Sequence, residues 1–132
     1  MSAGPLTTAF MLLALCLLFV GCRGKALEPT YPVHGVVTLD QKPLANGTIV
    51  FLTAETGDLQ AIAVTDGKYA GEARAGVRRV EIRAYLTSTA PRNPLDPPPA
   101  NYILAKYNAE STLTANVTPT GANTFDFELE SK

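Results

Sequence analysis

The stretch LQAIAVTDGKYAGE, residues 59–72, decides the fold. Two short runs with β-like patterning flank Asp66-Gly67, and Asp-Gly is the strongest short-range signal for a β-hairpin because both residues tolerate a positive φ. We therefore expect strands over 59–65 and 68–72, joined by a tight turn. Alternation with a period of two continues on both sides of this hairpin, which predicts further strands rather than helices.

The pattern outside the hairpin predicts an all-β domain. Apolar and polar side chains alternate over 31–40, 77–85, 111–118 and 123–130, and Gly76 opens the second of these segments. Residues 47–53 are apolar enough to be covered on both faces. Turn-forming residues separate the segments, as is typical of a β-sandwich. The sequence thus predicts a seven-stranded sandwich without a long helix, with one helical turn possible within 102–107.

Residues 86–101 interrupt the strand pattern. Their prolines are Pro91, Pro94, Pro97, Pro98 and Pro99. Proline donates no backbone hydrogen bond and favours the extended polyproline II conformation, and a long loop in a compact domain tends to be functional or disordered. Tyr85, Tyr102 and Tyr107 stand at or near the edges of this loop. Two interpretations stay open: the loop is a recognition surface, or Tyr102 and Tyr107 simply pin it to the core, and we prefer the second.

The N-terminus carries a short apolar run that ends at a cysteine. Residues 9–20 are almost wholly apolar, and no Lys, Arg, Asp or Glu occurs before Arg23. The run is too short for a membrane span, which needs about 20 apolar residues, and matches the apolar region of a signal peptide. The ending Phe19-Val20-Gly21-Cys22 resembles a bacterial lipobox, in which the cysteine is lipidated and becomes the new N-terminus. It departs from that pattern in having Phe19 instead of Leu and no basic residue before the run.

These features predict three segments. Residues 1–21 are a lipoprotein signal peptide, residues 22–30 a polar tether, and residues 31–132 the β-sandwich domain. Cys22 is the lipid-attachment residue, and a freely secreted domain with an ordinary signal peptide is the alternative. The expected location is therefore the bacterial cell envelope, with the domain lipid-anchored to a membrane and facing the periplasm or the cell surface.

Composition excludes several classes of function. The formal net charge is −1, so nothing favours electrostatic binding to nucleic acid. The two cysteines, Cys16 and Cys22, both precede the domain, which can therefore form no disulfide and no thiolate metal site. The domain must rely on its hydrophobic core.

The domain also resembles a known family. Residues 31–51, YPVHGVVTLDQKPLANGTIVF, are similar to the opening of carboxypeptidase-regulatory-like domains, and AVTDGKY (63–69) and VEIRA (80–84) resemble their later hairpin and strand. The resemblance implies a transthyretin-like sandwich of seven strands, a fold that serves the parent peptidases as an accessory without catalytic residues. Together with KYN (106–108) and NTFDFEL (123–129), it is similar to small lipoproteins of planctomycete bacteria.

Candidate catalytic residues are few. His34 lies on the polar face of the first strand, where a solvent-exposed position is a better interpretation than an acid–base or zinc role. Ser88 and Ser111 are the serines weighed for a catalytic triad, and neither lies in a Gly-x-Ser-x-Gly elbow. A likeness of 34–45 to transthyretin-related hydroxyisourate hydrolases fails on spacing, on the missing second His and on the C-terminal sequence.

Charged side chains offer two further candidates. Asp40, Asp58 and Asp66 fall in turns, where we expect them to form local hydrogen bonds rather than a calcium site. A local basic cluster, just before and within the fifth predicted strand, consists of Arg74, Arg78, Arg79 and Arg83. Because Glu81 lies between Arg79 and Arg83 on one face, a cross-paired exposed face is a better interpretation than a site for an anionic glycan or lipid head group.

The sequence therefore predicts a non-enzymatic, lipid-anchored envelope module with an interaction or structural role, which uses no metal and no cofactor. A carbohydrate- or peptide-binding module that uses the Pro-rich loop 86–101 is the alternative. The expected partners are the membrane, through lipidated Cys22, and an envelope protein or glycan.

Overall fold

A computed structural model describes residues 28–86 and 90–132, and within them the chain is all-β with a single helical turn. The predicted signal peptide (1–21), Cys22, most of the tether and Ser88 lie outside the described residues. The elements are β1 (Thr30–Leu39), β2 (Lys42–Pro43), β3 (Asn46–Leu52), β4 (Leu59–Thr65), β5 (Lys68–Arg74), β6 (Gly76–Arg83), the 3-10 turn η1 (Ala105–Tyr107), β7 (Thr114–Val117) and β8 (Phe127–Leu129).

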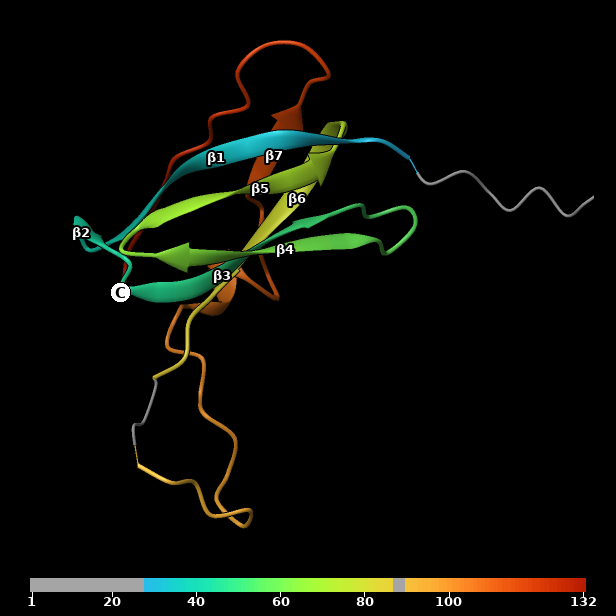
Figure 1. The fold of residues 1–132 in the computed structure, drawn as a ribbon. Helices are drawn as coiled ribbons and strands as arrows, with labels where there is room; N and C mark the ends of the chain where they lie inside the picture. Colours follow the sequence, from blue (N-terminus) through green and yellow to red (C-terminus); the bar gives the residue numbers. More distant parts are fainter. Residues whose placement is uncertain (1–27, 87–89) are drawn as a thin grey trace, which may run out of the picture.

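The strands form one connected sheet that curls around its own core (Figure 1). Its order is β2-β1-β5-β4-β3-β6-β7, and β8 pairs with β1 off this path. Each predicted strand segment overlaps one of these strands, and β2 is an addition that the sequence did not predict. Every neighbouring pair is antiparallel except β1 and β8, which run parallel.

Two tight turns explain the local pairing. Asp66 and Gly67 have φ values of 51° and 76°, and Thr65 pairs with Lys68, so the predicted hairpin of β4 and β5 is confirmed. Asp40 and Gln41 have φ values of 51° and 67°, which turns the chain from β1 into β2. Positive φ at both central residues matches the right-handed twist of the flanking strands.

The concave face of the curl holds the core. The alternating residues of the predicted strands point inward, and the largest fully buried side chains are Phe51, Ile49, Ile82, Leu129, Val33, Val37, Val64, Val80 and Val117. The predicted two-sided burial of the second strand is confirmed, because Ile49, Val50 and Phe51 are buried in succession. The Phe51 ring lies 6.1 Å from that of Tyr69 and 6.3 Å from that of Phe125, measured between centroids.

A buried asparagine joins the two ends of the curl. Asn123 is 5% exposed, and its Nδ2 donates to the carbonyls of Thr118 (2.9 Å) and Pro32 (3.2 Å). Its Oδ1 accepts from the Thr118 N–H at 2.9 Å, and its carbonyl accepts from the His34 N–H at 3.1 Å. Asn123 thus bonds, through its side chain and its backbone, to β1 and to the residue after β7. The backbone groups that it bonds to are satisfied there without a further strand.

Candidate functional site

The Pro-rich loop leaves the sheet from a fixed base; we call its described part, residues 86 and 90–100, the arm (Figure 1). Tyr85 and Asn101 form an antiparallel bridge at the base. Asn101 Oδ1 accepts from the backbone N–H groups of Ala84 (3.0 Å) and Ile103 (3.1 Å), and the Tyr102 N–H donates to the Ala84 carbonyl at 3.0 Å. Since Ile103 is only 4% exposed, the returning chain is anchored in the core directly beyond the arm.

The tip of the arm is a hydrogen-bonded turn over residues 93–96. The Asp96 N–H donates to the Asn93 carbonyl at 2.9 Å, and the Asn93 N–H donates to Asp96 Oδ2 at 3.1 Å. Asn93 Oδ1 also accepts from the Leu95 N–H at 3.1 Å. Pro94 occupies the second position, where its fixed φ favours a turn. The turn differs from the extended conformation expected of the Pro-rich loop, and the Asn-Pro-x-Asp sequence inside the loop is a turn signal that the proline content masked.

The two charged side chains of the arm form hydrogen bonds within it. Arg92 and Asp96 are the charged residues of 85–101. Arg92 Nη2 donates to the carbonyls of Asp96 and Pro97, which ties the two limbs of the arm together above the base. The two charges cancel in sum, so the net charge of the arm is close to zero, although both side chains are exposed.

The arm also exposes apolar side chains. Leu95 at the tip is 89% exposed, Leu86 is 75% exposed and Tyr85 is 45% exposed. A groove of about 600 Å³ lies between the limbs, and its lining residues are Tyr85, Leu86, Ala90, Pro91, Arg92, Asp96, Pro97 and Pro99. Exposed apolar groups gathered on one projection are typical of an interaction site, whereas apolar residues scattered singly over a surface are not.

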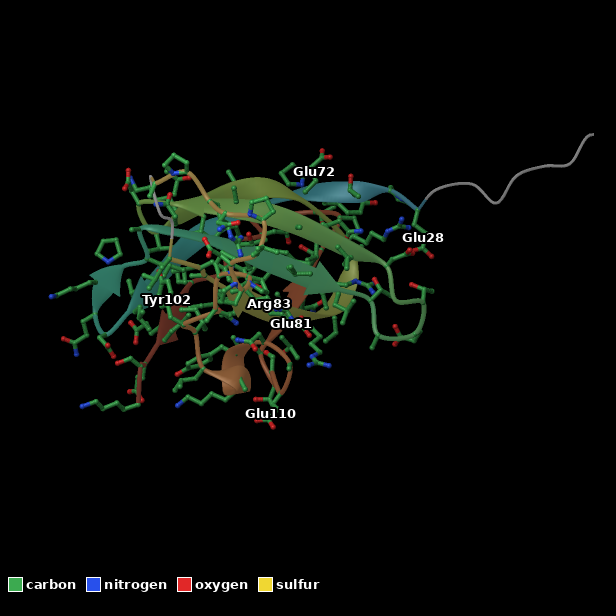
Figure 2. All side chains as sticks on the ribbon, turned by 90° about the horizontal axis from the view of Figure 1, so that it is seen from below. Glu28, Glu72, Glu81, Arg83, Tyr102 and Glu110 are labelled. Carbon is green, nitrogen blue, oxygen red and sulfur yellow. The ribbon has the colours of Figure 1, made fainter. Side chains whose placement is uncertain are left out.

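The flanking tyrosines divide between the two predicted roles. Tyr107 packs against the core and its hydroxyl accepts from the Glu130 N–H at 3.0 Å, so the pinning role is confirmed for this residue. Tyr102 is held through its backbone, and its side chain lies beside β2 in a separate shallow pocket with Leu39 and Pro43 (Figure 2). Tyr85 is the tyrosine that lines the groove of the arm.

The arginines after the hairpin split into two groups. Arg79 Nη2 lies 3.1 Å from Glu81 Oε1, and Arg83 Nη1 lies 2.9 Å from Glu81 Oε2, which confirms the predicted cross-pairing (Figure 2). The Glu81 side chain is only 12% exposed while those of the arginines are 35% exposed. The face is therefore more covered than predicted, because two guanidinium groups lie over one carboxylate.

Arg74 ends β5, and Arg78 lies near the start of β6. Arg78 donates to Thr53 Oγ1 at 2.7 Å, and Arg74 lies 3.5 Å from Glu28 and 3.8 Å from Asp58. The contacts of Arg74 with Asp58 and of Arg78 with Thr53 tie the β3–β4 loop to β5 and β6. The four arginines thus do not form one basic patch, and each has a partner within the fold.

The remaining candidates are held in structural contacts. His34 is exposed, as the sequence predicted, and its Nε2 lies 2.9 Å from Thr124 Oγ1, a contact that the sequence did not predict. His34, Lys68 and Asp126 line one shallow pocket. Ser111 is 8% exposed and donates to the Val80 carbonyl, so its hydroxyl is used within the fold.

The three turn aspartates lie in separate turns. Asp40 accepts from the Ser131 N–H at 3.0 Å and from the Ser131 hydroxyl. These two hydrogen bonds lower the pKa of Asp40 below its ordinary value of 3.8, because they stabilise the charged form. Asp58 faces Arg74, and Asp66 forms the hairpin turn. Over residues 28–86 and 90–132, no group of three or more His, Cys, Asp or Glu residues is placed to hold a metal ion.

No protein-family model, no curated protein and no solved structure matches this chain. The likeness to carboxypeptidase-regulatory-like domains therefore stays a prediction from the quoted motifs. In the part of the chain that the structure describes, no helix has the length and apolar character required to cross a membrane.

Proposed function

We propose that this chain is a non-enzymatic, lipid-anchored module of a bacterial envelope that acts by binding a partner through its arm. The observation that carries the proposal is an arm with exposed apolar side chains and no net charge, which is hydrogen-bonded at its base and at its tip. The apolar run that ends at Cys22 supports the anchor. The seven predicted strands and the quoted motifs support a transthyretin-like sandwich of the carboxypeptidase-regulatory-like kind.

A role without catalysis is supported by how the chain uses its reactive groups. The Ser111 hydroxyl is buried and bonded to a backbone carbonyl, and His34 contacts a threonine on an exposed face. Asp126, the carboxylate that lines the same pocket as His34, accepts from the Val36 N–H at 2.9 Å. A nucleophile, a base and an orienting acid that act together must bond to one another, and these groups bond to the fold instead.

A carbohydrate- or peptide-binding module is the second candidate, favoured by the groove of about 600 Å³ between the limbs of the arm. In this case the groove receives the ligand, and the Tyr85 ring supplies the stacking surface. Binding to a glycan array or to isolated cell wall should then disappear in Tyr85→Ala and persist in Tyr102→Ala, whose ring lies in the pocket beside β2. Binding that is insensitive to Tyr85→Ala would remove this candidate.

The anchor is tested by the intact mass of the protein purified from membranes of its own host. We expect the mass of residues 22–132 plus acyl chains, and a Cys22→Ser variant should lose both the acyl chains and the membrane fraction. Stable anchoring requires more than one acyl chain, because a single acyl chain holds a protein only weakly and reversibly on a bilayer. A bare mass that begins at another residue would show a freely secreted domain.

A further inference from the structure

We propose that the arm is itself the ligand and inserts, tip first, into an aromatic-lined groove of a partner protein, at the end of the fold away from Thr30, where β1 begins. This inference rests on the proposed function, since the arm has a partner only if the chain acts by binding one. It goes beyond that function by naming which surface is inserted, where it points and what chemistry receives it.

The strand register sets the direction of the arm. Thr30, the last residue of the predicted tether, pairs with Arg74, and β6 begins two residues after Arg74, at Gly76. β6 then runs for eight residues, about 23 Å at about 3.3 Å per residue, before it leads into the base of the arm. The chain therefore enters the sheet beside the start of β6, while the arm leaves from its far end (Figure 1).

The tip is organised before any partner binds. The 93–96 turn is closed by one backbone hydrogen bond and two side-chain hydrogen bonds, and Arg92 ties the outgoing limb to the returning one. Leu95 projects from this turn with 89% of its surface in solvent. A ligand that already holds its bound shape loses less conformational entropy on binding, so such a tip suits insertion into a pocket.

The returning limb selects the chemistry of the partner. Asp96, Pro97 and Pro98 each precede a proline, which pushes all three towards extended or polyproline II conformation. The prolines supply carbonyl acceptors and no N–H donors. Such a segment fits grooves lined by aromatic side chains, whose rings pack on proline and whose N–H or O–H groups donate to the carbonyls beyond Pro97, which Arg92 does not reach.

A lipid surface fits the arm less well. Hydrocarbon cannot satisfy exposed backbone carbonyls, and each unsatisfied group costs several kcal/mol there. The near-zero charge of the arm also gives no attraction to anionic head groups or acidic glycans. A protein groove satisfies both the apolar Leu95 and the acceptor-rich limb.

The test places a photoreactive benzoylphenylalanine at Leu95 in the full lipidated chain, expressed in its own host. The control position is Leu59, which is 58% exposed at the end of the sheet where β1 begins. We expect a protein adduct from position 95 whose linked residue lies among aromatic side chains of the partner. A second change, Pro98→Ala with Pro99→Ala, should reduce the adduct about tenfold, the loss expected of a hot spot. Thr114→Ala, also exposed, should leave the yield unchanged.

The other outcomes overturn the inference in distinguishable ways. Adducts with lipid, with glycan or with a second copy of this chain would show a different occupant. A protein adduct from Leu59 and none from Leu95 would contradict the inserted arm but leave an envelope interaction standing. No protein adduct from either position would overturn the inference and the proposed interaction role together, whereas the acyl mass tests the anchor separately.

Discussion

Gly35 sits where β1 meets the chain segment that leads into β8. A Cβ at this position would lie 1.9 Å from the Phe125 carbonyl oxygen and 2.9 Å from the Tyr69 hydroxyl. Neither group has room to move, because the Tyr69 hydroxyl donates to that same carbonyl at 2.5 Å. The contact explains why the alternating core pattern of β1 is interrupted by a glycine.

Gly35→Ala should therefore reduce the free energy of unfolding by about 3 kcal/mol or more, the upper end of the cost of overpacking. Urea unfolding monitored by circular dichroism measures the change. Gly57→Ala is the control, because nothing lies within 4 Å of its Cβ and only the positive φ of 74° is unfavourable, at about 1–2 kcal/mol. Equal losses in the two variants would contradict the close approach at Gly35.

Tyr69 links pH to stability. Burial raises the pKa of its phenol well above the ordinary value of 10.0, and the nearby charge of Asp126 adds to the rise. Because the folded state holds the proton more tightly than the unfolded state, the stabilisation is complete below pH 10 and is lost as the pH rises above that value. Tyr69→Phe removes the titrating group together with its hydrogen bond.

We expect Tyr69→Phe to cost about 1–2 kcal/mol at pH 7, since the buried Phe125 carbonyl loses its donor. The difference between the variant and the original chain should shrink as the pH is raised above 10. Urea unfolding at a series of pH values up to 11 measures both effects. Tyr85→Phe, at a side chain that is 45% exposed, should leave the profile unchanged, and a constant difference for Tyr69→Phe would refute the link.

At the scale of the elements, β8 is a strand of three residues held along the edge of β1. Val37 pairs with Phe127 and Leu39 with Leu129, and the inward side chains Phe127 and Leu129 are 9% and 1% exposed. Glu128 between them is exposed. Phe127→Ala should cost about 3–5 kcal/mol and Glu128→Ala less than about 0.5 kcal/mol in urea unfolding. Similar losses would show that the register of β8 is shifted by one residue.

β8 also shows what the sequence could predict and what it could not. Alternation over 123–130 correctly placed Phe125, Phe127 and Leu129 on the inner face, because the period of a strand fixes the face of each side chain. It could not predict the partner strand, since the parallel pairing with β1 joins residues about 90 positions apart in the chain. The β4–β5 hairpin was predictable in full because its pairing is decided by two adjacent turn residues.

The arm, too, was predictable from the sequence only in part. Its position and its proline content were readable from the sequence, and so was the break in the strand pattern. The base was not predicted, because Asn101 holds it by bonding to Ala84, which lies 17 positions earlier in the chain and is brought close only by the fold. The tip turn was within reach of the sequence, since Asn, Pro and Asp at 93, 94 and 96 are residues that form turns.

At the scale of the whole molecule, we expect the arm to contribute little to the free energy of unfolding of the curled sheet. The core lies inside the curl, and Asn123 closes the gap between β1 and the residue that follows β7. Every described residue from 90 to 100 is exposed. The core of the sheet thus stabilises the fold, and the arm is available to bind a partner.

This separation predicts the result of removing the arm. Tyr85 and Asn101 already face each other across a β-bridge, so Asn-Gly in place of residues 86–100 closes a hairpin without moving either strand. The free energy of unfolding should stay the same or rise by up to about 2 kcal/mol, because a shorter loop loses less entropy on closure. Ile103→Ala, at a buried residue beyond the base, should instead cost about 2–5 kcal/mol. Thermal and urea unfolding distinguish the two, and a large loss on removal of the arm would mean that it packs on the sheet and cannot enter a partner without unfolding part of it.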